Sequence, residues 1–134
     1  STAWVAIDPV EELLLGPAYA VPAALERAGL TLDDIGVWEI HEAFAVPVLA
    51  ALQLLADGAF CKEKLGLSRA LGEIDPAKVN RWGGSLSVGH PFGATGARLV
   101  MTCAERLVAE RKRYGLVTAC AAGAMGHAIV LERA

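Results

Sequence analysis

The sequence has few charges and few aromatic residues, and its charges form no large cluster of one sign. Charged residues make up 20% of the 134 residues and aromatic residues 6%, and the formal net charge is −3. The basic run Arg111-Lys112-Arg113 follows a helical pattern, where cations suit the C-terminal end of a helix dipole. The chain therefore lacks the basic stripe or patch that a nucleic-acid-binding domain needs.

Long apolar runs and disulfide patterns are also missing. No apolar run reaches the length of a membrane-spanning helix, about 18 residues, and no signal-peptide pattern is visible. The cysteines, Cys61, Cys103 and Cys120, are three in number and form no Cys-x-x-Cys pair. These features favour a reducing compartment, and we expect a cytoplasmic protein without a membrane span.

Several common catalytic and metal-binding motifs are absent as well. Gly89, Gly93 and Gly96 do not form GxGxxG, no lysine follows to make a P-loop, and no GxSxG turn is present. The stretch "HEAFA" at 41–45 begins like a zinc-protease helix, but Ala45 stands where a second histidine ligand is required. Without closely spaced Cys and His pairs, no metal site is expected.

The remaining features of the sequence are those of an α/β domain. Apolar residues make up 54% of the chain, enough for one domain with one sizeable core. Strands are predicted at 3–7, 35–40, 116–120 and 127–131, and helices at 22–28, 43–56 and 96–113. The last two strands are joined by small residues and should form a hairpin. The segment 57–82 is predicted to contain a short helix and an irregular excursion from the sheet. This alternation predicts a mixed sheet with helices on its faces.

Two of the predicted helices differ in pattern. The segment 43–56 is apolar nearly all round, with Gln53 its only strongly polar residue, so we expect it to be buried on every side. Pro47 should lie in its first turn or kink it. The segment 96–113 is amphipathic: its apolar face carries Val100, Cys103, Ala104, Leu107 and Val108, whereas Arg98, Glu105, Arg106 and Glu110 fall mostly off that face.

Three titratable residues lie where α/β proteins place their sites. His41 follows a predicted strand, Cys120 ends another, and His90 lies inside the glycine-rich stretch "GGSLSVGHPFGATG". Each alone also has a structural explanation, since a histidine can cap a strand and a buried cysteine is usually a small hydrophobe. His127 starts a strand among apolar residues and is interpreted as structural. A cysteine with one or two histidines and no metal suits proton transfer beside a stabilised oxyanion.

Three blocks of the sequence resemble, in order and spacing, the signature blocks of the C-terminal half of thiolases. They are "HEAFA" at 41–45, "NRWGGSLSVGHPFGATGAR" at 80–98 and "CAAGAMGHA" at 120–128. Most thiolases carry asparagine at the first position of the first block. His41 at that place, together with the length of 57–79, is similar to the long-chain type, the β-subunits of fatty-acid oxidation complexes. The resemblance implies a βαβαβαββ half with a mixed five-stranded sheet and helices on both faces.

The resemblance also implies catalytic roles. His90 would activate a nucleophilic cysteine and later help to hold the thioester oxygen. Cys120 would be the acid and base that gives or removes the α-proton of the acetyl group. His41 would position a water in the oxyanion site together with His90, as an amide N–H does in other thiolases. Because decarboxylating ketosynthases use a second histidine where thiolases have this cysteine, Cys120 argues against them.

Substrate-binding roles follow from the same resemblance. Phe44 would line the acyl or pantetheine channel, and the backbone N–H of Ala122 would donate to a second oxyanion site. Gly123 is small enough to let such backbone groups approach the substrate. Thiolases commonly have two or three glycines in this block, whereas here Ala124 and Met125 follow Gly123. If position 124 requires a positive φ, alanine strains the loop.

The thiolase nucleophile lies in the N-terminal half, which no part of this chain resembles. We therefore expect residues 1–134 to be a C-terminal domain of a 3-ketoacyl-CoA thiolase, which converts a 3-ketoacyl-CoA and CoA to acetyl-CoA and a shortened acyl-CoA. The expected partners are the N-terminal half, acyl-CoA and CoA, further copies of the chain and a hydratase/dehydrogenase subunit. Coenzyme A would be a substrate, with no covalent cofactor. The alternative is a non-catalytic thiolase-like domain that binds acyl-CoA or a partner subunit.

Overall fold

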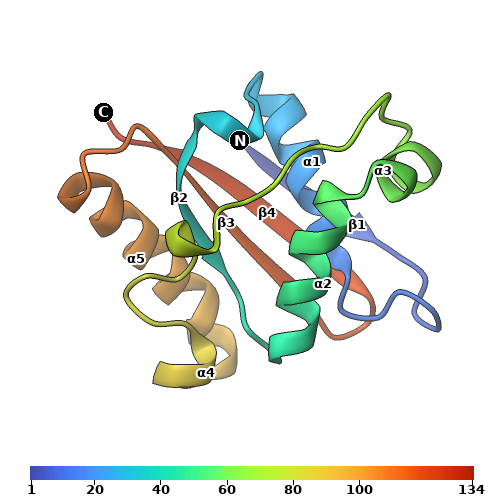
Figure 1. The fold of residues 1–134 in the computed structure, drawn as a ribbon. Helices are drawn as coiled ribbons and strands as arrows, with labels where there is room; N and C mark the ends of the chain where they lie inside the picture. The colour runs from blue at the N-terminus through green and yellow to red at the C-terminus, as the bar shows by residue number, and fades with distance from the viewer.

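Residues 1–134 form a mixed sheet of four strands in the computed structural model (Figure 1). The strands are β1 (Thr2–Ala6), β2 (Ile35–Ile40), β3 (Tyr114–Ala121) and β4 (Met125–Glu132). Their order is β1-β4-β3-β2, with β2 parallel to β3 and the other neighbours antiparallel. The predicted β3–β4 hairpin and the mixed character of the sheet are confirmed.

The expected five-stranded sheet is one strand too many. Beyond β2, the chain makes only a single parallel bridge, between Trp38 and Val79. Pro76 begins a short 3-10 turn just before that bridge, η2 (Pro76–Lys78). Asn80 then adopts a left-handed φ of 46°, which ends any extended run. The fifth position is thus reduced to one bridging residue.

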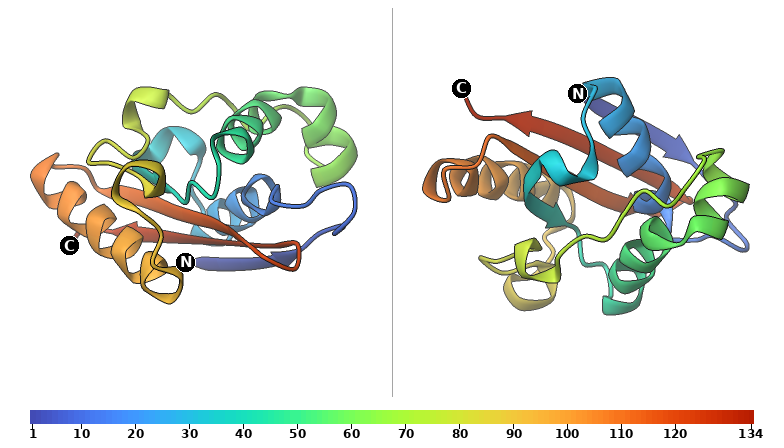
Figure 2. Two further views of the ribbon diagram at one scale, coloured as in Figure 1. Left: turned by 90° about the horizontal axis from the view of Figure 1, so that it is seen from below. Right: turned by 45° about the horizontal axis from the view of Figure 1, so that its top comes forward.

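Helices cover both faces of the sheet (Figure 2). They are α1 (Gly16–Ala28), α2 (Ala45–Ala56), α3 (Gly58–Leu65), α4 (Ser85–Val88) and α5 (Thr95–Ala109), with further 3-10 turns η1 (Leu32–Asp34) and η3 (Phe92–Ala94). α1 packs on β4, β1 and β3, whereas α5 packs on β2 and β3 from the other side. No single helix is long and apolar enough to cross a membrane; α2 and α3 together reach that length and composition, with an 89° bend between them.

Two helix boundaries differ from the sequence prediction. α1 starts at Gly16 rather than at 22, because Pro17 and not Pro22 occupies its first turn. Pro22 lies inside the helix, where it has no N–H for the usual bond to the preceding turn. α5 ends at Ala109 rather than at 113, since Arg111 takes a left-handed φ of 52°.

α2 is not buried on every side, so the prediction for 43–56 is wrong for this chain. Ala51 and Leu55 are its buried residues. Val46 and Leu49 are 73% and 58% exposed. α2 packs beside α1 and α3, and these neighbours cover only part of its surface. Pro47 lies in its first turn, as predicted.

The core is divided by the sheet into two apolar clusters. The larger lies on the α1 side and includes Leu25, Trp38 and Leu116. The smaller lies under α5 and includes Leu99 and Cys103. Each cluster buries one side of the strands that lead to the site.

The sequence pattern placed Arg106 off the apolar face of the helix, and this prediction is wrong. The residue is fully buried. Its Nη1 lies 2.6 Å from a carboxylate oxygen of Glu39 and its Nε lies 2.8 Å from one of Glu110. It also donates to the carbonyls of Trp38 at 3.0 Å and Lys78 at 2.9 Å. A buried charge needs such partners, and hydropathy alone does not reveal them.

α1 begins in direct backbone contact with β4, and this contact requires two glycines. A Cβ added to Gly16 would lie 2.5 Å from the Cα of Gly126, and one added to Gly126 would overlap the carbonyl of Gly16. Gly126 also pairs with Cys120 across the β3–β4 hairpin. The close approach therefore fixes the first turn of α1 beside the end of β3.

We expect Gly126→Ala to destabilise the fold by about 1–3 kcal/mol, because a backbone carbonyl cannot move aside as a flexible side chain does. Urea unfolding followed by circular dichroism measures the change. Gly58→Ala is the matched control, since the nearest atom to its added Cβ lies at 3.8 Å. Equal stability of the Gly126→Ala and Gly58→Ala variants would contradict this account of the contact.

Candidate active site

A cavity of about 520 Å³ opens at the end of β3, beside the residues that follow β2. Because β2 and β3 run parallel, their carboxyl ends reach the same edge of the sheet. His41, His90 and Cys120 all line this cavity, as do Phe44 and Ala122. The structure thus brings together three titratable residues that lie far apart in sequence.

His41 is positioned by the backbone of β3. Its N–H donates to the carbonyl of Thr118 at 2.8 Å, which extends the parallel ladder one residue beyond β2. The residue is only 6% exposed. Its Nδ1 lies 2.9 Å from Oγ of Ser85, the first residue of α4. The backbone of His41 is therefore held by β3, and its ring is held by the start of α4.

The side chain of Asn80 makes the hydrogen bonds to the end of β2 that a fifth strand would otherwise make. Its Oδ1 accepts from the Ile40 N–H and its Nδ2 donates to the Ile40 carbonyl, both at 2.8 Å. Nδ2 also donates to the Glu42 carboxylate at 2.7 Å, and that carboxylate accepts from the Leu86 N–H at 3.0 Å. A Cβ at Gly84 would overlap the carboxylate, so a larger residue there would push Glu42 out of these hydrogen bonds. The two residues that flank His41 are fixed by this network.

His90 lies between α4 and α5, next to His41. The centroids of the two imidazole rings are 4.4 Å apart. Nδ1 of His90 lies 2.7 Å from Oγ1 of Thr95, the buried first residue of α5. His90 itself is exposed in this chain. Its ring is anchored at one nitrogen and open to the cavity at the other.

Cys120 is the penultimate residue of β3 and is 7% exposed. It forms no disulfide. Burial raises the pKa of its thiol above the ordinary value, with the backbone acting in the opposite direction. The group is therefore a neutral thiol near neutral pH and holds a proton that it can donate.

The turn after Cys120 is strained at Ala124, because the backbone there has the positive φ that was the condition for strain. Gly123 has a φ of 87° and Ala124 a φ of 55°, so position 124 is left-handed despite its Cβ. This conformation costs an alanine about 1 kcal/mol. Ala122 faces the cavity, whereas Gly123 is not among its lining residues and contributes to the turn.

The electrostatics of the site keep His41 neutral. Burial lowers the pKa of His41 most, and the neighbouring charges of His90 and Arg98 lower it further, while Glu42 opposes them. A neutral imidazole has one N–H donor and one acceptor nitrogen. No three His, Cys, Asp or Glu side chains of this chain come together as metal ligands.

His127 lies apart from these groups, within β4. Its ring stacks on Trp4 with centroids 4.0 Å apart, and its Nε2 lies 2.7 Å from Oγ1 of Thr2. These contacts join β4 to β1 and give His127 a structural role.

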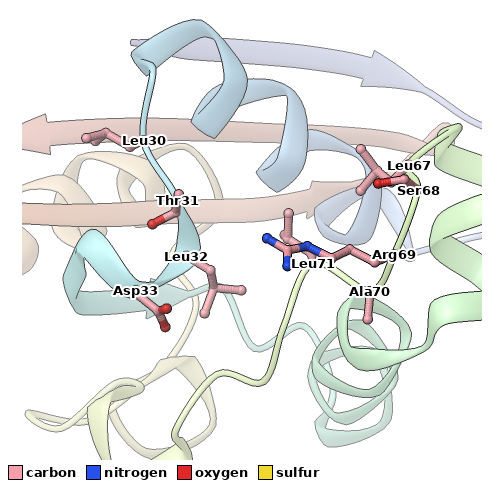
Figure 3. A pocket seen from close by; sticks show the side chains of 9 residues that line it. All are labelled: Leu30, Thr31, Leu32, Asp33, Leu67, Ser68, Arg69, Ala70 and Leu71. Atoms are coloured by element: carbon pink, nitrogen blue, oxygen red, sulfur yellow. The ribbon is translucent and has the colours of Figure 1, made fainter.

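Figure 3 shows a second pocket, of about 310 Å³, between the start of η1 and the chain after α3. It is lined by residues 30–33 and 67–71 and shares none of them with the larger cavity. Its polar side chains, Thr31, Asp33, Ser68 and Arg69, are all exposed. It therefore has no buried polar group that would anchor a ligand.

Sequence reasoning missed most of the residues that support the histidines. Asn80, Ser85, Thr95 and Arg98 all lie in the glycine-rich block 80–98, from which only His90 was selected. A hydroxyl or amide becomes informative only when its partner is known, and these partners lie on β2 or across a loop. Glu42 is adjacent to His41, and that position could have indicated a supporting role, but the residue belongs to no motif of its own.

The family follows from comparison with known proteins. Residues 1–133 match the family described as "Thiolase, C-terminal domain". The chain therefore belongs to the thiolase family, as the resemblance of its three blocks predicted.

Three relatives show the similarity more closely. The chain is 53% identical over 129 residues to the mitochondrial trifunctional enzyme subunit beta of Bos taurus, covering 96% of this chain and 27% of that protein. It is 51% identical over 129 residues to a probable 3-ketoacyl-CoA thiolase of Caenorhabditis elegans, covering 96% and 29%. It is 52% identical over 132 residues to a 3-ketoacyl-CoA thiolase of Salmonella paratyphi B, covering 98% and 30%. The chain thus spans less than a third of the length of these relatives.

We expect the folded chain to lose stability as the pH falls from about 7 to about 5, and His41 to account for part of the loss. Its pKa is lowered in the folded state, so the unfolded chain takes up the proton first. Its contribution is complete above the ordinary histidine value of 6.5 and declines as the pH falls below it. Urea unfolding of the protein and its His41→Asn variant at both pH values measures this share.

The contribution of His41 to the pH dependence is measured most clearly in a His127→Asn background, because burial lowers the pKa of His127 as well. In that background, His41→Asn should flatten the dependence of unfolding free energy on pH. An unchanged slope would show that the His41 pKa is not lowered by folding.

Proposed function

We propose that this chain is the C-terminal domain of a 3-ketoacyl-CoA thiolase, which transfers an acyl group between a 3-ketoacyl-CoA and CoA. The supporting observation is the convergence of His41, His90 and Cys120 on one cavity. The products are acetyl-CoA and a shortened acyl-CoA, as in fatty-acid β-oxidation. Coenzyme A is a substrate, and the proposed reaction needs no covalent cofactor.

In the first step, a cysteine from the rest of the enzyme attacks the 3-keto carbon of the substrate. His90 takes the proton of that cysteine, so that a thiolate forms the new carbon–sulfur bond. The bond between the second and third carbons then breaks, and its electron pair moves to the second carbon as an enolate. Nδ1 of His90 is occupied by its contact with Thr95 Oγ1 at 2.7 Å, which leaves the other ring nitrogen free for this proton.

In the second step, Cys120 gives its proton to the enolate carbon and acetyl-CoA leaves. The raised pKa of the buried thiol supports this role, because the proton is present when the carbanion develops. The resulting thiolate takes the proton of the incoming CoA thiol, whose sulfur attacks the acyl group. The nucleophilic cysteine leaves as a thiolate and regains its proton from His90. Cys120 thus returns to its starting state.

The enolate is costly in water, so fixed donors at its oxygen supply much of the rate enhancement. We assign this task to His41, acting with His90 on a bound water. The N–H of Ala122 in the hairpin turn would donate to a second oxyanion site. Gly123 allows that turn to form. Phe44 is 63% exposed at the mouth of the cavity and would contact the acyl or pantetheine chain.

We further propose that residues 1–134 form one domain whose partners are the thiolase N-terminal half and further copies of the chain. The name of the bovine relative, a trifunctional enzyme subunit beta, supports assembly with a hydratase/dehydrogenase subunit. The three free cysteines support a reducing compartment, and a cytoplasmic location is our proposal for this chain.

In the complete enzyme, Cys120→Ala should abolish proton exchange into acetyl-CoA while the nucleophilic cysteine still becomes acylated. The reason is that Cys120 moves protons and does not attack the substrate. Exchange is followed in deuterated water by mass spectrometry, and acylation by trapping the acyl-enzyme. Cys61→Ala, at a buried cysteine outside the cavity, is the control for lost packing. Equal loss of both partial reactions in Cys120→Ala would contradict the assignment.

The 134-residue chain by itself should self-associate and should not catalyse thiolysis. Val46 and Leu49 on α2 and Met101 on α5 are exposed apolar residues of the kind that associate in water. His90 and Cys120 move protons, but neither replaces the missing acyl carrier. Sedimentation measures association, and incubation with acetoacetyl-CoA and CoA measures turnover. A strictly monomeric chain at high concentration, or turnover by the purified chain, would contradict these two expectations.

A further inference from the structure

His41 is joined to two further side chains by hydrogen bonds. Its Nδ1 lies 2.9 Å from Ser85 Oγ, and Nη2 of Arg98 donates to the same oxygen at 3.0 Å. Ser85 begins α4 and Arg98 lies in the first turn of α5. The two hydrogen bonds therefore link His41 to the starts of both helices. His41 and Ser85 are each 6% exposed. Neither Ser85 nor Arg98 lines the cavity.

The chemistry of these three groups gives the hydrogen bonds a direction. A guanidinium has only donors, so Arg98 cannot accept the hydroxyl hydrogen of Ser85. Ser85 Oγ has two side-chain partners, and His41 Nδ1 is the only one of them that can accept. If Nδ1 carried a proton instead, the serine hydrogen would be buried without a partner, which proteins avoid.

We propose that Ser85, oriented by Arg98, is a positioning residue that fixes His41 as the tautomer with its proton on Nε2. The ring nitrogen away from Ser85 is then an N–H donor on the cavity side. The proposal rests on the proposed thiolase function only for what this donor meets, namely the water or oxygen of the oxyanion site. It explains how an imidazole, which has two possible donors, can do the work of an amide N–H.

His90 differs from His41 in this respect. Its Nδ1 contacts Thr95 Oγ1 at 2.7 Å, and no cationic donor contacts that hydroxyl. The direction of this bond is not set by a second partner, which suits a residue that must take and return a proton. The two neighbouring histidines therefore have different supporting groups for different tasks.

The first test is the proton position itself. In the 134-residue protein labelled with ¹⁵N-histidine, long-range ¹H–¹⁵N spectra should show His41 Nδ1 as an unprotonated nitrogen and Nε2 as a protonated one. Ser85→Ala should produce a population with the proton on Nδ1, and Ser85→Thr should restore the single tautomer. Ser87→Ala, on the same helix and bonded to the Gly84 carbonyl, should change nothing at His41. A proton on Nδ1 in the unmodified protein, or an unchanged tautomer in Ser85→Ala, would overturn the proposal.

The second test is a double-mutant cycle in the complete enzyme. Ser85→Ala should lower kcat about 10- to 100-fold with little change in KM, as expected when an oxyanion donor is misdirected. In a His41→Asn background the same substitution should have almost no further effect, because an amide needs no tautomer control. Equal losses in both backgrounds would show that Ser85 only supports the fold and would overturn the proposal. An unmodified enzyme without thiolysis would instead refute the proposed function, while the tautomer measurement would still decide the role of Ser85.

Discussion

The buried ion pair between Arg106 and Glu39 is the contact on which the arrangement of the site depends. Both side chains are fully buried, and the same guanidinium bonds to the carbonyls of Trp38 and Lys78. Three pieces of chain are therefore joined at one point: β2, the helix α5 and the segment that carries Asn80. Removing one partner would leave a charge buried without compensation, which is far more costly than losing an exposed ion pair.

This junction connects the fold to the position of the histidines. Asn80 follows the Lys78 carbonyl closely in sequence and bonds both backbone groups of Ile40, next to His41. α5 starts at Thr95, the partner of His90, and carries Arg98 in its first turn. Arg106 lies farther along the same helix and joins that helix to β2 and to the segment before Asn80. The site is a property of this packed unit, although Arg106 is remote from the cavity.

The sequence predicted the elements whose periodicity is local. β2 was predicted with its observed bounds, and the amphipathic helix and the final hairpin were found because their patterns repeat over many residues. The errors occur where an outcome depends on a partner outside the segment. Arg106 was placed on the wrong face because its carboxylate partner Glu39 lies on another element. The exposed side of α2 was taken as buried because apolar composition does not say which neighbour is present.

The same distinction applies to the site. Strand ends and the glycine-rich block drew attention to His41, His90 and Cys120, and all three line one cavity. Their supporting hydroxyl and amide groups had no separate signal, because Ser, Thr and Asn are common in loops for many reasons. The direction of a hydrogen bond, as at Ser85, depends on counting donors and acceptors in three dimensions.

The contact between Gly16 and Gly126 has a consequence for reading genetic variation in such proteins. Gly126 pairs with Cys120, so a substitution there that abolished activity would naturally be attributed to damaged chemistry. The backbone of α1 fills the space that any side chain would need, and the primary defect would be a lower amount of folded protein. A variant at this position could therefore respond to a stabilising ligand or a lower growth temperature, which a substitution of Cys120 would not.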